Sequence, residues 1–324
     1  MIRVGILSAA HSHTDAYAGL LAGREDCGLV GVADRDEERG REAADRYGTD
    51  YLPADRLLKS IDAGVICAAN ASHLEWFERA AMAGVDVLCE KPLAPTVAEA
   101  RAIVDCWEET EIVAGVAMPL RFCGPAVRAR ERLAEDPIGS LRALSGTNRG
   151  KMPGGWFADP DRAGGGAVMD HSVHIVDLAT HLTGRRVAEV YAEVDTRFHD
   201  IAVDDVNVLS MELADGTPFL LDGSWSKPDA WHTWGDATLE LVGEEGTVAI
   251  DYTDQSVVHT TESGVGTAFY GPDADAGLIA DFVESVREGR DPEITPDEGL
   301  AAVAVVEAAY ESAETGEAVA VAER

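Results

Sequence analysis

The stretch Cys89-Glu90-Lys91-Pro92-Leu93 directly follows an apolar run, Val85-Asp86-Val87-Leu88, which has the pattern of a short buried strand. Because proline has no backbone N–H, the Glu-Lys-Pro sequence ends this strand abruptly. Ligands of open α/β sheets bind at the carboxyl ends of the strands, so Lys91 is expected to face a crevice. The chain has four lysines beside 22 arginines, and lysine exchanges a proton where arginine does not. We interpret Lys91 as a candidate catalytic residue, the alternative being a solvated lysine beside a glutamate.

Residues 1–118 alternate short apolar runs with amphipathic stretches. The predicted strands are Arg3–Leu7, Leu29–Ala33, Val65–Ala68, Val85–Leu88 and Ile112–Val116. The predicted helices are Asp15–Ala22, Glu37–Tyr47, Leu74–Ala83 and Val97–Trp107. Strands that alternate with helices indicate a parallel sheet, and right-handed crossovers between them build a doubly wound α/β fold. We expect residues 1–118 to form the first domain.

The remainder, residues 119–324, has a different pattern. Its predicted strands are Leu141–Thr147, Val187–Val194, Val206–Leu213, Pro218–Ser226, Ala237–Val242 and Thr247–Tyr252, followed by helices at Leu278–Arg287 and Glu298–Glu314. Asp215-Gly216 and Glu245-Gly246 have the composition of hairpin turns. The sequence therefore predicts a second, α+β domain with a largely antiparallel open sheet.

The first predicted turn is Gly5-Ile6-Leu7-Ser8-Ala9-Ala10-His11-Ser12-His13. A dinucleotide fingerprint, G-x-G-x-x-G, would place glycines where Ser8, Ala10 and His13 stand, so the motif itself is absent. The N-terminus of the following helix still offers N–H groups to a phosphate, and Ser12 adds a hydroxyl or a cap.

Asp34 ends the second predicted strand, at the distance from the first turn where an acid binds the adenosine ribose of NAD. Arg35 follows directly and would instead suit the 2′-phosphate of NADP. A solvated loop in an acid-rich chain is the alternative for both residues.

A glycine-rich stretch, Gly164-Gly165-Gly166, leads into a predicted helix in the second domain. We interpret the glycines as a flexible hinge. On that helix the spacing places four titratable residues on one face: Asp170, His174, Asp177 and His181. Such a row suits acid–base chemistry, a metal site with two histidines and two carboxylates, or simply a polar helix face, and the spacing leaves these three interpretations open.

The formal net charge of −33 is the strongest compositional signal. It argues against nucleic acid and anionic membranes as partners, because both would repel such a surface. The acidic residues recur along the whole chain with few lysines, which is typical of proteins from salt-loving archaea.

The five cysteines include no C-x-x-C pair, no run of about 20 apolar residues exists, and the start lacks a signal-peptide pattern. We therefore expect a cytoplasmic protein with reduced thiols.

Taken together, Glu90-Lys91-Pro92, the run from Gly164 through Asp170 and His174 to Asp177, and the closing Thr295–Glu314 segment resemble the glucose-fructose oxidoreductase / inositol dehydrogenase (Gfo/Idh/MocA) family. The resemblance covers nearly the whole chain. It implies a Rossmann domain, an α/β domain whose open sheet pairs subunits into a homodimer or homotetramer, and NAD or NADP as cofactor, with a slight preference for NAD. It also implies hydride transfer to or from a sugar, cyclitol or related polyol.

The resemblance further implies roles for single residues. Lys91 matches the lysine that hydrogen-bonds the reacting hydroxyl, Asp170 the substrate-binding aspartate and His174 the acid–base histidine; no metal is implied. The Lys91–Pro92 peptide bond is often cis in the family. The implied cofactor-binding residues are Ser8, Ala10, His11, Ser12, His13, Asp34, Arg35, Asn70, His73, Glu90 and Lys91.

Two other functions remain open at this point. Some relatives use bound NAD catalytically to cleave glycosides, which returns the hydride and yields no net NADH. Other relatives bind NAD without turnover and act as sensors.

Overall fold

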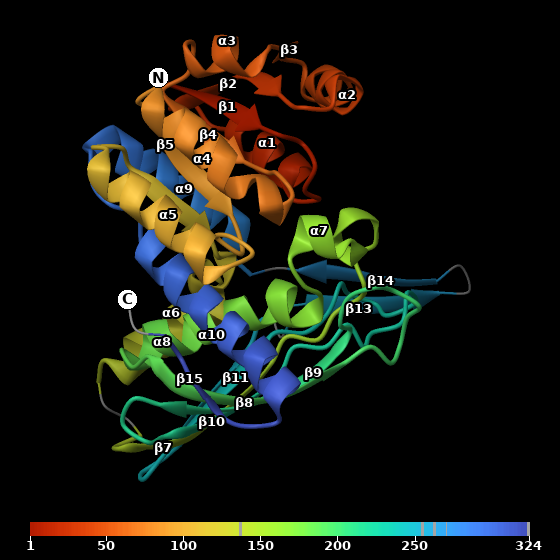
Figure 1. The fold of residues 1–324 in the computed structure, drawn as a ribbon, viewed down its shortest axis with the longest axis vertical. Helices are drawn as coiled ribbons and strands as arrows, with labels where there is room; N and C mark the ends of the chain where they lie inside the picture. Colours follow the sequence, from red (N-terminus) through yellow and green to blue (C-terminus); the bar gives the residue numbers. More distant parts are fainter. Residues whose placement is uncertain (136–137, 254–255, 262–263, 270, 323–324) are drawn as a thin grey trace. The chain divides into compact units, whose positions relative to one another are not determined.

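The computed structural model of the chain describes residues 1–135, 138–253, 256–261, 264–269 and 271–322 (Figure 1). The chain forms two compact units. The first unit consists of Met1–Met118 and Asp275–Leu300, and the second of Pro119–Ala274 and Ala301–Arg324. The sequence-based expectation places all of residues 119–324 in one domain, whereas residues 275–300 lie with the first unit.

A parallel sheet of six strands forms the centre of the first unit, in the order β3-β2-β1-β4-β5-β6. Its strands are β1 Ile2–Leu7, β2 Cys27–Ala33, β3 Asp50–Tyr51, β4 Ala63–Ile66, β5 Asp86–Glu90 and β6 Ala114–Ala117. The predicted doubly wound fold is confirmed. The strand order reverses between β1 and β4, which is the point where such sheets bind their ligands.

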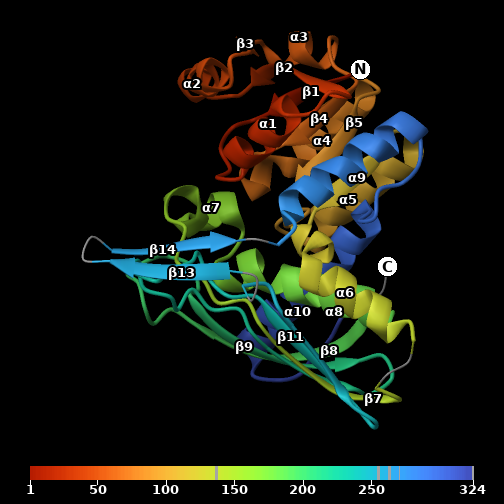
Figure 2. The same cartoon turned by 180° about the vertical axis from the view of Figure 1, so that it is seen from behind.

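Helices cover both faces of this sheet. They are α1 Thr14–Ala22, α2 Glu37–Tyr47, α3 Ala54–Leu58, α4 His73–Met82, α5 Val97–Glu109 and α9 Ala274–Glu288, with a 3₁₀ turn at Asn70–Ser72. Helices α4 and α5 lie on one face, and α1 and α9 on the other (Figures 1 and 2). The side chains of Asp36 and Thr96 cap α2 and α5 by accepting the N–H groups of Arg39 and Glu99, each at 3.2 Å.

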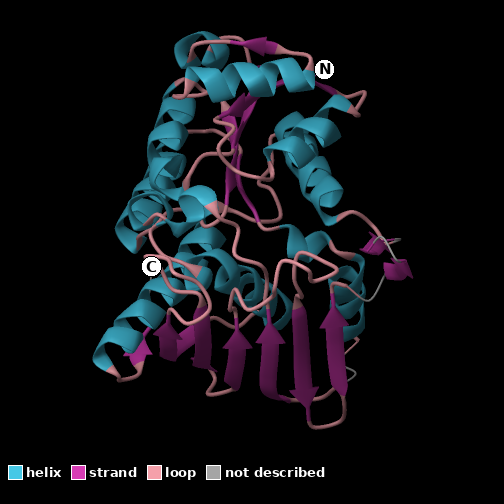
Figure 3. Ribbon diagram, turned by 90° about the vertical axis from the view of Figure 1, so that its right-hand side faces the viewer, coloured by secondary structure: helices cyan, strands magenta, loops and turns pink. Residues whose placement is uncertain are grey.

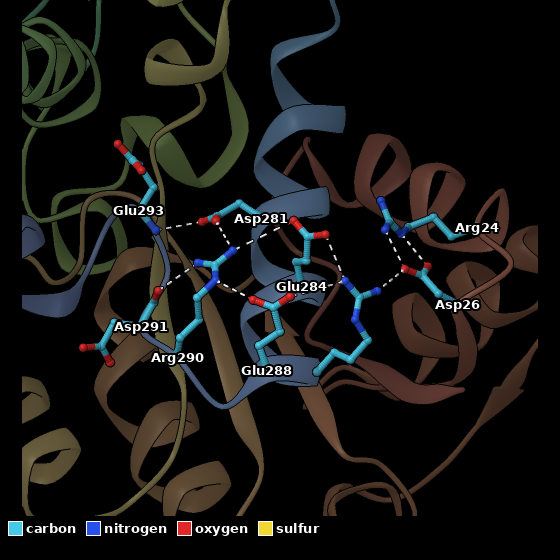
Figure 4. A network of polar contacts seen from close by, with 9 residues as sticks. Arg24, Asp26, Asp281, Glu284, Glu288, Arg290, Asp291 and Glu293 are labelled. Carbon is cyan, nitrogen blue, oxygen red and sulfur yellow. Dashed lines mark hydrogen bonds and ion pairs between the residues drawn. The ribbon is translucent and has the colours of Figure 1, made fainter.

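A network of charged side chains on α9 and the segment after it includes one ion pair to the rest of the first unit (Figure 4). Arg287 lies 3.3 Å from Asp26, which pairs with Arg24 at 2.8 Å. The other labelled members of this network are Asp281, Glu284, Glu288, Arg290, Asp291 and Glu293. Beyond the helix, the Ile294 carbonyl accepts the N–H of Val116 at 3.1 Å. The returning segment therefore covers β6, the edge strand of the sheet, which would otherwise offer unpaired backbone groups.

The second unit contains a mixed sheet of seven strands in the order β12-β11-β7-β10-β9-β8-β15 (Figure 3). Its strands are β7 Leu141–Thr147, β8 Val187–Asp195, β9 Val206–Leu213, β10 Pro218–Asp222, β11 Thr238–Gly243, β12 Thr247–Asp251 and β15 Val319–Ala320. Only β7 and β10 pair in parallel among these described strands, so the predicted, largely antiparallel sheet is confirmed. A separate two-stranded antiparallel sheet, which the sequence did not predict, pairs β13 Ser256–Thr261 with β14 Gly264–Phe269.

The helices of the second unit are α6 Gly124–Leu133, α7 Pro160–Ala163, α8 Val173–Thr183 and most of α10 Pro296–Thr315, with 3₁₀ turns at Pro119–Phe122 and Gly155–Ala158 and a π turn at Val168–Ser172. Helices α6 and α8 lie along one face of the sheet (Figure 2). On the strands, buried and exposed side chains alternate, and Tyr191, Val208 and Leu220 are 39%, 44% and 51% exposed. No described helix combines the length and apolar character needed to cross a membrane.

Candidate active site

Asp34 anchors the β1–α1 loop to the end of β2. Its Oδ2 accepts the hydroxyl of Ser8 at 3.1 Å, the N–H of Ala9 at 2.6 Å and Nε of Arg39 at 3.0 Å. Its Oδ1 accepts Nη2 of Arg39 at 2.5 Å and the N–H of Asp36 at 2.8 Å. Burial raises the pKa of Asp34, but Arg39 and the N–H groups outweigh it and hold the pKa below its ordinary value. The predicted ribose-binding acid is thus already surrounded by five donors.

The two arginines near this acid have different partners. Arg35, predicted to face a 2′-phosphate, forms an ion pair with Glu75, and both side chains are about half exposed. Arg39, which the sequence analysis missed, is the cation at Asp34, and its side chain is 35% exposed. The first turn of α2 brings Arg39 back over the end of β2. A cation five residues beyond Asp34 is therefore the sequence feature that could have predicted this ion pair.

Ser8 has a left-handed backbone, with φ of 71°, at the position of the first fingerprint glycine. Such a conformation costs a non-glycine residue on the order of 1–3 kcal/mol. The hydrogen bond from Ser8 to Asp34 offsets part of this cost. The loop then continues with Ala10 and His11, whose N–H groups both donate to the Cys67 carbonyl, at 3.0 and 2.9 Å.

Glu90 is fully buried at the end of β5 and faces two histidines of the β1–α1 loop. Its Oε1 lies 2.9 Å from Nδ1 of His13 and 3.6 Å from Nδ1 of His11, while its Oε2 accepts the Lys91 N–H at 3.0 Å. Burial raises the pKa of Glu90, but the histidines and Lys91 outweigh it and hold the pKa well below its ordinary value. Glu90 is therefore a buried anion beside the loop.

Lys91 is 4% exposed and its peptide bond to Pro92 is cis, as the resemblance implied. The neighbouring His73 is fully buried, with Nδ1 2.9 Å from the Pro92 carbonyl and Nε2 3.2 Å from the Ala68 carbonyl. Burial lowers the pKa of His73. Both ring nitrogens are thus directed at backbone, so His73 fixes the turn that carries Lys91. Asn70, 3% exposed, begins the adjacent 3₁₀ turn.

Two of the three glycines in the stretch 164–166 are tightly packed. Gly164 has a left-handed φ of 79° and ends α7. A Cβ on Gly165 would collide with the hydroxyl of Tyr310, and one on Gly166 would collide with the carbonyl of Asp204. Gly165 and Gly166 therefore permit close packing here, and the flexible hinge stays a prediction.

Asp204 fixes the start of the helical segment that follows. Its Oδ1 accepts the N–H of Gly166 and the hydroxyl of Tyr310, both at 2.8 Å, and its Oδ2 accepts the N–H of Val168 at 2.9 Å. Burial raises the pKa of Asp204. This carboxylate therefore holds the turn that carries the predicted substrate residues.

Asp170 lies in the π turn Val168–Ser172 that precedes α8. Its Oδ2 accepts Nε1 of Trp225 at 3.2 Å and lies 3.2 Å from Nε2 of the fully buried His171. A π turn has one more residue per hydrogen-bonded turn than an α-helix, so it rotates Asp170 out of the register that a continuous α-helix predicts. The sequence offered no signal for this turn.

His174 and Asp177 lie on α8, 8% and 4% exposed. The carboxylate of Asp177 forms a buried, two-pronged ion pair with Arg121, at 2.9 and 2.5 Å. Removing either partner would leave a buried charge, so this pair is structural. The two carboxylates of the predicted row thus have different partners, since Asp170 accepts from Trp225 and Asp177 pairs with Arg121.

Among the described residues, one group of three could hold a metal ion: His11, His13 and Glu90, whose ligand atoms all lie within 4.8 Å of one another. The predicted row around Asp170 and His174 does not form such a group among these residues. In that cluster, Nδ1 of His11 accepts the N–H of His13 at 3.2 Å, so its lone pair is directed at backbone. The cluster is therefore a hydrogen-bonded network of protein groups.

Comparison with known proteins agrees with this geometry. Residues 2–118 match the model of an oxidoreductase family with an NAD-binding Rossmann fold, and residues 126–249 match the GFO/IDH/MocA C-terminal domain. The D-xylose 1-dehydrogenase (NADP(+)) 2 of Haloferax volcanii is 30% identical over 297 residues, which are 89% of this chain and 90% of that protein. The chain belongs to the Gfo/Idh/MocA family.

Other Gfo/Idh/MocA proteins are similar over almost the whole chain. Inositol 2-dehydrogenase of Rhizobium meliloti is 27% identical over 330 residues, 96% of each chain. The crystal structure of GenD2 from gentamicin A biosynthesis, in complex with NAD, superposes with a TM-score of 0.90 at 27% identity, covering 99% of this chain and 97% of that one. Like its family, the chain is an NAD(P)-dependent oxidoreductase.

The first unit of this Gfo/Idh/MocA protein has residues that fit a dinucleotide. The β1–α1 loop stands at the strand-order reversal of the sheet, and α1 begins directly after it. Ser12, at the tip of this loop, is exposed. Asp34 and Arg39 end β2 and begin α2, where the ribose of such cofactors is bound. The fold thus accommodates the cofactor although the glycine fingerprint is absent.

Proposed function

We propose that the chain transfers hydride between NAD(P) and a secondary alcohol of a sugar, cyclitol or related polyol. The observation that carries this proposal is Lys91, a buried lysine at the carboxyl end of β5, in a sheet that fits a dinucleotide. The names of the D-xylose and inositol dehydrogenases among its relatives support this substrate class.

Each unit supplies part of the chemistry. In the first unit, Lys91 donates a hydrogen bond to the oxygen of the reacting hydroxyl. In the second, His174 removes the proton from that oxygen during oxidation and Asp170 binds substrate hydroxyls, with Nε1 of Trp225 donating a hydrogen bond to its carboxylate. When bound, the nicotinamide supplies the site that accepts or returns the hydride.

A screen of NAD and NADP reduction against a panel of sugars and polyols, in molar KCl, tests this proposal. Net formation of NADH or NADPH with at least one member is expected. Cleavage of glycosides without net reduced cofactor would favour the hydrolase alternative, and tight NAD binding without turnover of any kind would favour a sensor.

For the cofactor we keep the slight preference for NAD, because the Asp34 carboxylate would repel a 2′-phosphate. Arg39 opposes this preference, since it stands beside Asp34 and its guanidinium would attract the same phosphate. The Haloferax volcanii relative carries NADP(+) in its name. The balance between these two side chains therefore sets the choice of cofactor.

Replacing Asp34 with alanine is expected to weaken NAD binding more than NADP binding. The loop loses its anchor for both cofactors, but the released Arg39 can pair with a 2′-phosphate. Dissociation constants for both cofactors, from fluorescence quenching, measure this difference. Asp36→Ala is the matched control, because it removes a neighbouring carboxylate that caps α2 without binding Ser8 or Ala9. Equal losses for NAD and NADP would mean that Asp34 acts through the loop alone.

We propose that the open face of the seven-stranded sheet joins subunits into a homodimer or homotetramer. The exposed apolar side chains of Tyr191, Val208 and Leu220 on this face support it.

The five cysteines form no disulfide, which supports a reducing, cytoplasmic location. The net charge of −33 argues against nucleic acid and anionic membranes as partners.

We also propose that the acidic surface adapts the protein to high salt, as in proteins of salt-loving archaea. At low salt the charges repel one another over a longer range, so loss of structure or of the oligomer is expected below about 0.15 M ionic strength. Thermal melts and light scattering in a KCl series, from low to molar salt, measure this. A melting temperature that does not change across the series would contradict the adaptation to salt.

A further inference from the structure

The β1–α1 loop has few backbone N–H groups left for a phosphate. In glycine fingerprints several such groups point at the cofactor's pyrophosphate. Here the N–H groups of six residues from 8 to 14 donate within the chain: Ser8 to Ala33, Ala9 to Asp34, Ala10 and His11 to Cys67, His13 to His11, and Thr14 to His11. Within this fully described loop, the N–H of Ser12 alone has no partner in the chain.

The imidazole of His13 belongs to the same loop and pairs with a buried carboxylate. Nδ1 of His13 lies 2.9 Å from Oε1 of Glu90, so it donates a hydrogen bond to that carboxylate. The Glu90 side chain is fully buried, whereas that of His13 is 36% exposed. The contact therefore uses the inner nitrogen of the ring and leaves Nε2 as the remaining polar atom of a partly exposed imidazole. When protonated, Nε2 is a charged donor.

We propose that the imidazolium of His13, hydrogen-bonded through Nδ1 to buried Glu90, binds the pyrophosphate of the nicotinamide cofactor together with Ser12, in place of the missing glycine-loop contacts. This inference rests on the proposed function. A charged donor to a phosphate oxygen forms a stronger hydrogen bond than a neutral one, so one imidazolium compensates for more than one backbone N–H. Glu90 would then act as a positioning residue that never touches the cofactor.

The charged groups that face His13 come from several elements. They are Glu90 and Lys91 from the end of β5, Asp275 from α9, and His11 and Tyr17 from the loop and α1. Burial and Lys91 lower the pKa of His13, but Glu90 and Asp275 outweigh them, so the pKa lies above its ordinary value. The imidazolium is the binding form. Cofactor affinity should therefore be highest at pH values below the pKa of His13 and fall as the pH rises through that pKa.

Calorimetric titration of the wild-type chain with NAD and NADP tests this directly. Dissociation constants are measured from about pH 6 to about pH 9, a range that spans histidine titration. At each pH, buffers of different ionisation enthalpy give the number of protons taken up. We expect affinity to fall by about 10-fold or more across the range, the size of a charge-assisted hydrogen bond, with proton uptake near the midpoint. Affinity that does not depend on pH, without proton uptake, would overturn the inference.

Two variants separate the role of His13, which binds the cofactor, from that of Glu90, which positions His13. His13→Gln keeps a neutral donor and should bind with lower affinity that no longer varies with pH. Glu90→Gln should shift the midpoint to lower pH while affinity at low pH is kept, a change that a merely structural role would not produce. An unchanged pH profile in both variants, with thermal melts like the wild type, would overturn the inference.

His199→Gln is the matched control, because His199 also pairs with a buried carboxylate, that of Asp205 at 3.0 Å, and its side chain is 30% exposed. It belongs to the second unit and should leave the pH profile of cofactor binding unchanged. The proposed function fails in a different way: a wild-type chain that binds neither NAD nor NADP at any pH would overturn that function, and this inference with it.

Discussion

Replacing His174 with asparagine is expected to lower turnover by about 10²–10⁴-fold, the usual contribution of a general base. Asparagine keeps a hydrogen-bonding group of similar size but accepts no proton near neutral pH. In the wild type, the oxidation rate should rise with pH through one ionisation, and this step should vanish in the variant. Steady-state rates against pH, for a substrate found in the panel screen, measure both effects.

His181→Asn is the matched control for this prediction. It makes the same change on the same helix, two turns farther along α8. The pH step should persist in that variant. If His174→Asn keeps the wild-type pH profile, then Lys91 or a chain of water molecules is the base.

Replacing Lys91 with methionine should reduce turnover by about 10²–10³-fold, as for loss of a donor that stabilises a developing oxyanion. Methionine preserves most of the length and apolar volume of this buried side chain but removes its charge and its three donors. Cofactor affinity should change little, because the assigned partner of Lys91 is the substrate oxygen. Turnover and the NAD dissociation constant, measured on the same preparation, separate the two effects.

The control is Lys59→Met, which makes the same change at an exposed lysine in the first unit. It should leave turnover near the wild-type value. Near-normal turnover in Lys91→Met as well would show that Lys91 is a structural lysine at a strand end.

The fold was largely predictable because its signals are local. Alternating apolar and amphipathic runs predict the strands β1, β2, β4, β5 and β6 and the helices α1, α2, α4 and α5, but not the short helix α3. The seven-stranded sheet has period-2 patterns along its strands. The position of α9 was not predictable. Its sequence has the same amphipathic pattern whichever unit it joins, and its assignment depends on contacts more than 150 residues away, such as that between Arg287 and Asp26.

The residues of the candidate site could be predicted from the sequence, but most of the side chains that they contact could not. Lys91, Asp170 and His174 stand out from spacing and resemblance, yet the π turn at Val168–Ser172 changes how Asp170 is presented. The buried pair of Arg121 and Asp177 joins residues 56 positions apart, a distance at which the sequence pattern gives no signal. Pairing of charged groups across a fold is decided by tertiary packing, so such contacts had to come from the structure.

The late return of the chain to its first sheet has a consequence for protein synthesis. Strand β6 is finished by residue 117, but the segment that covers it, with Pro292 against Gly115 and the Ile294 carbonyl on Val116, belongs to residues 275–300. At about 5–20 residues per second, the ribosome needs on the order of 10–40 s to make the intervening chain. During that interval the nascent sheet has an uncovered edge, which is open to pairing with the wrong strand. The protein is therefore at risk of aggregation during synthesis until residues 275–300 have been made.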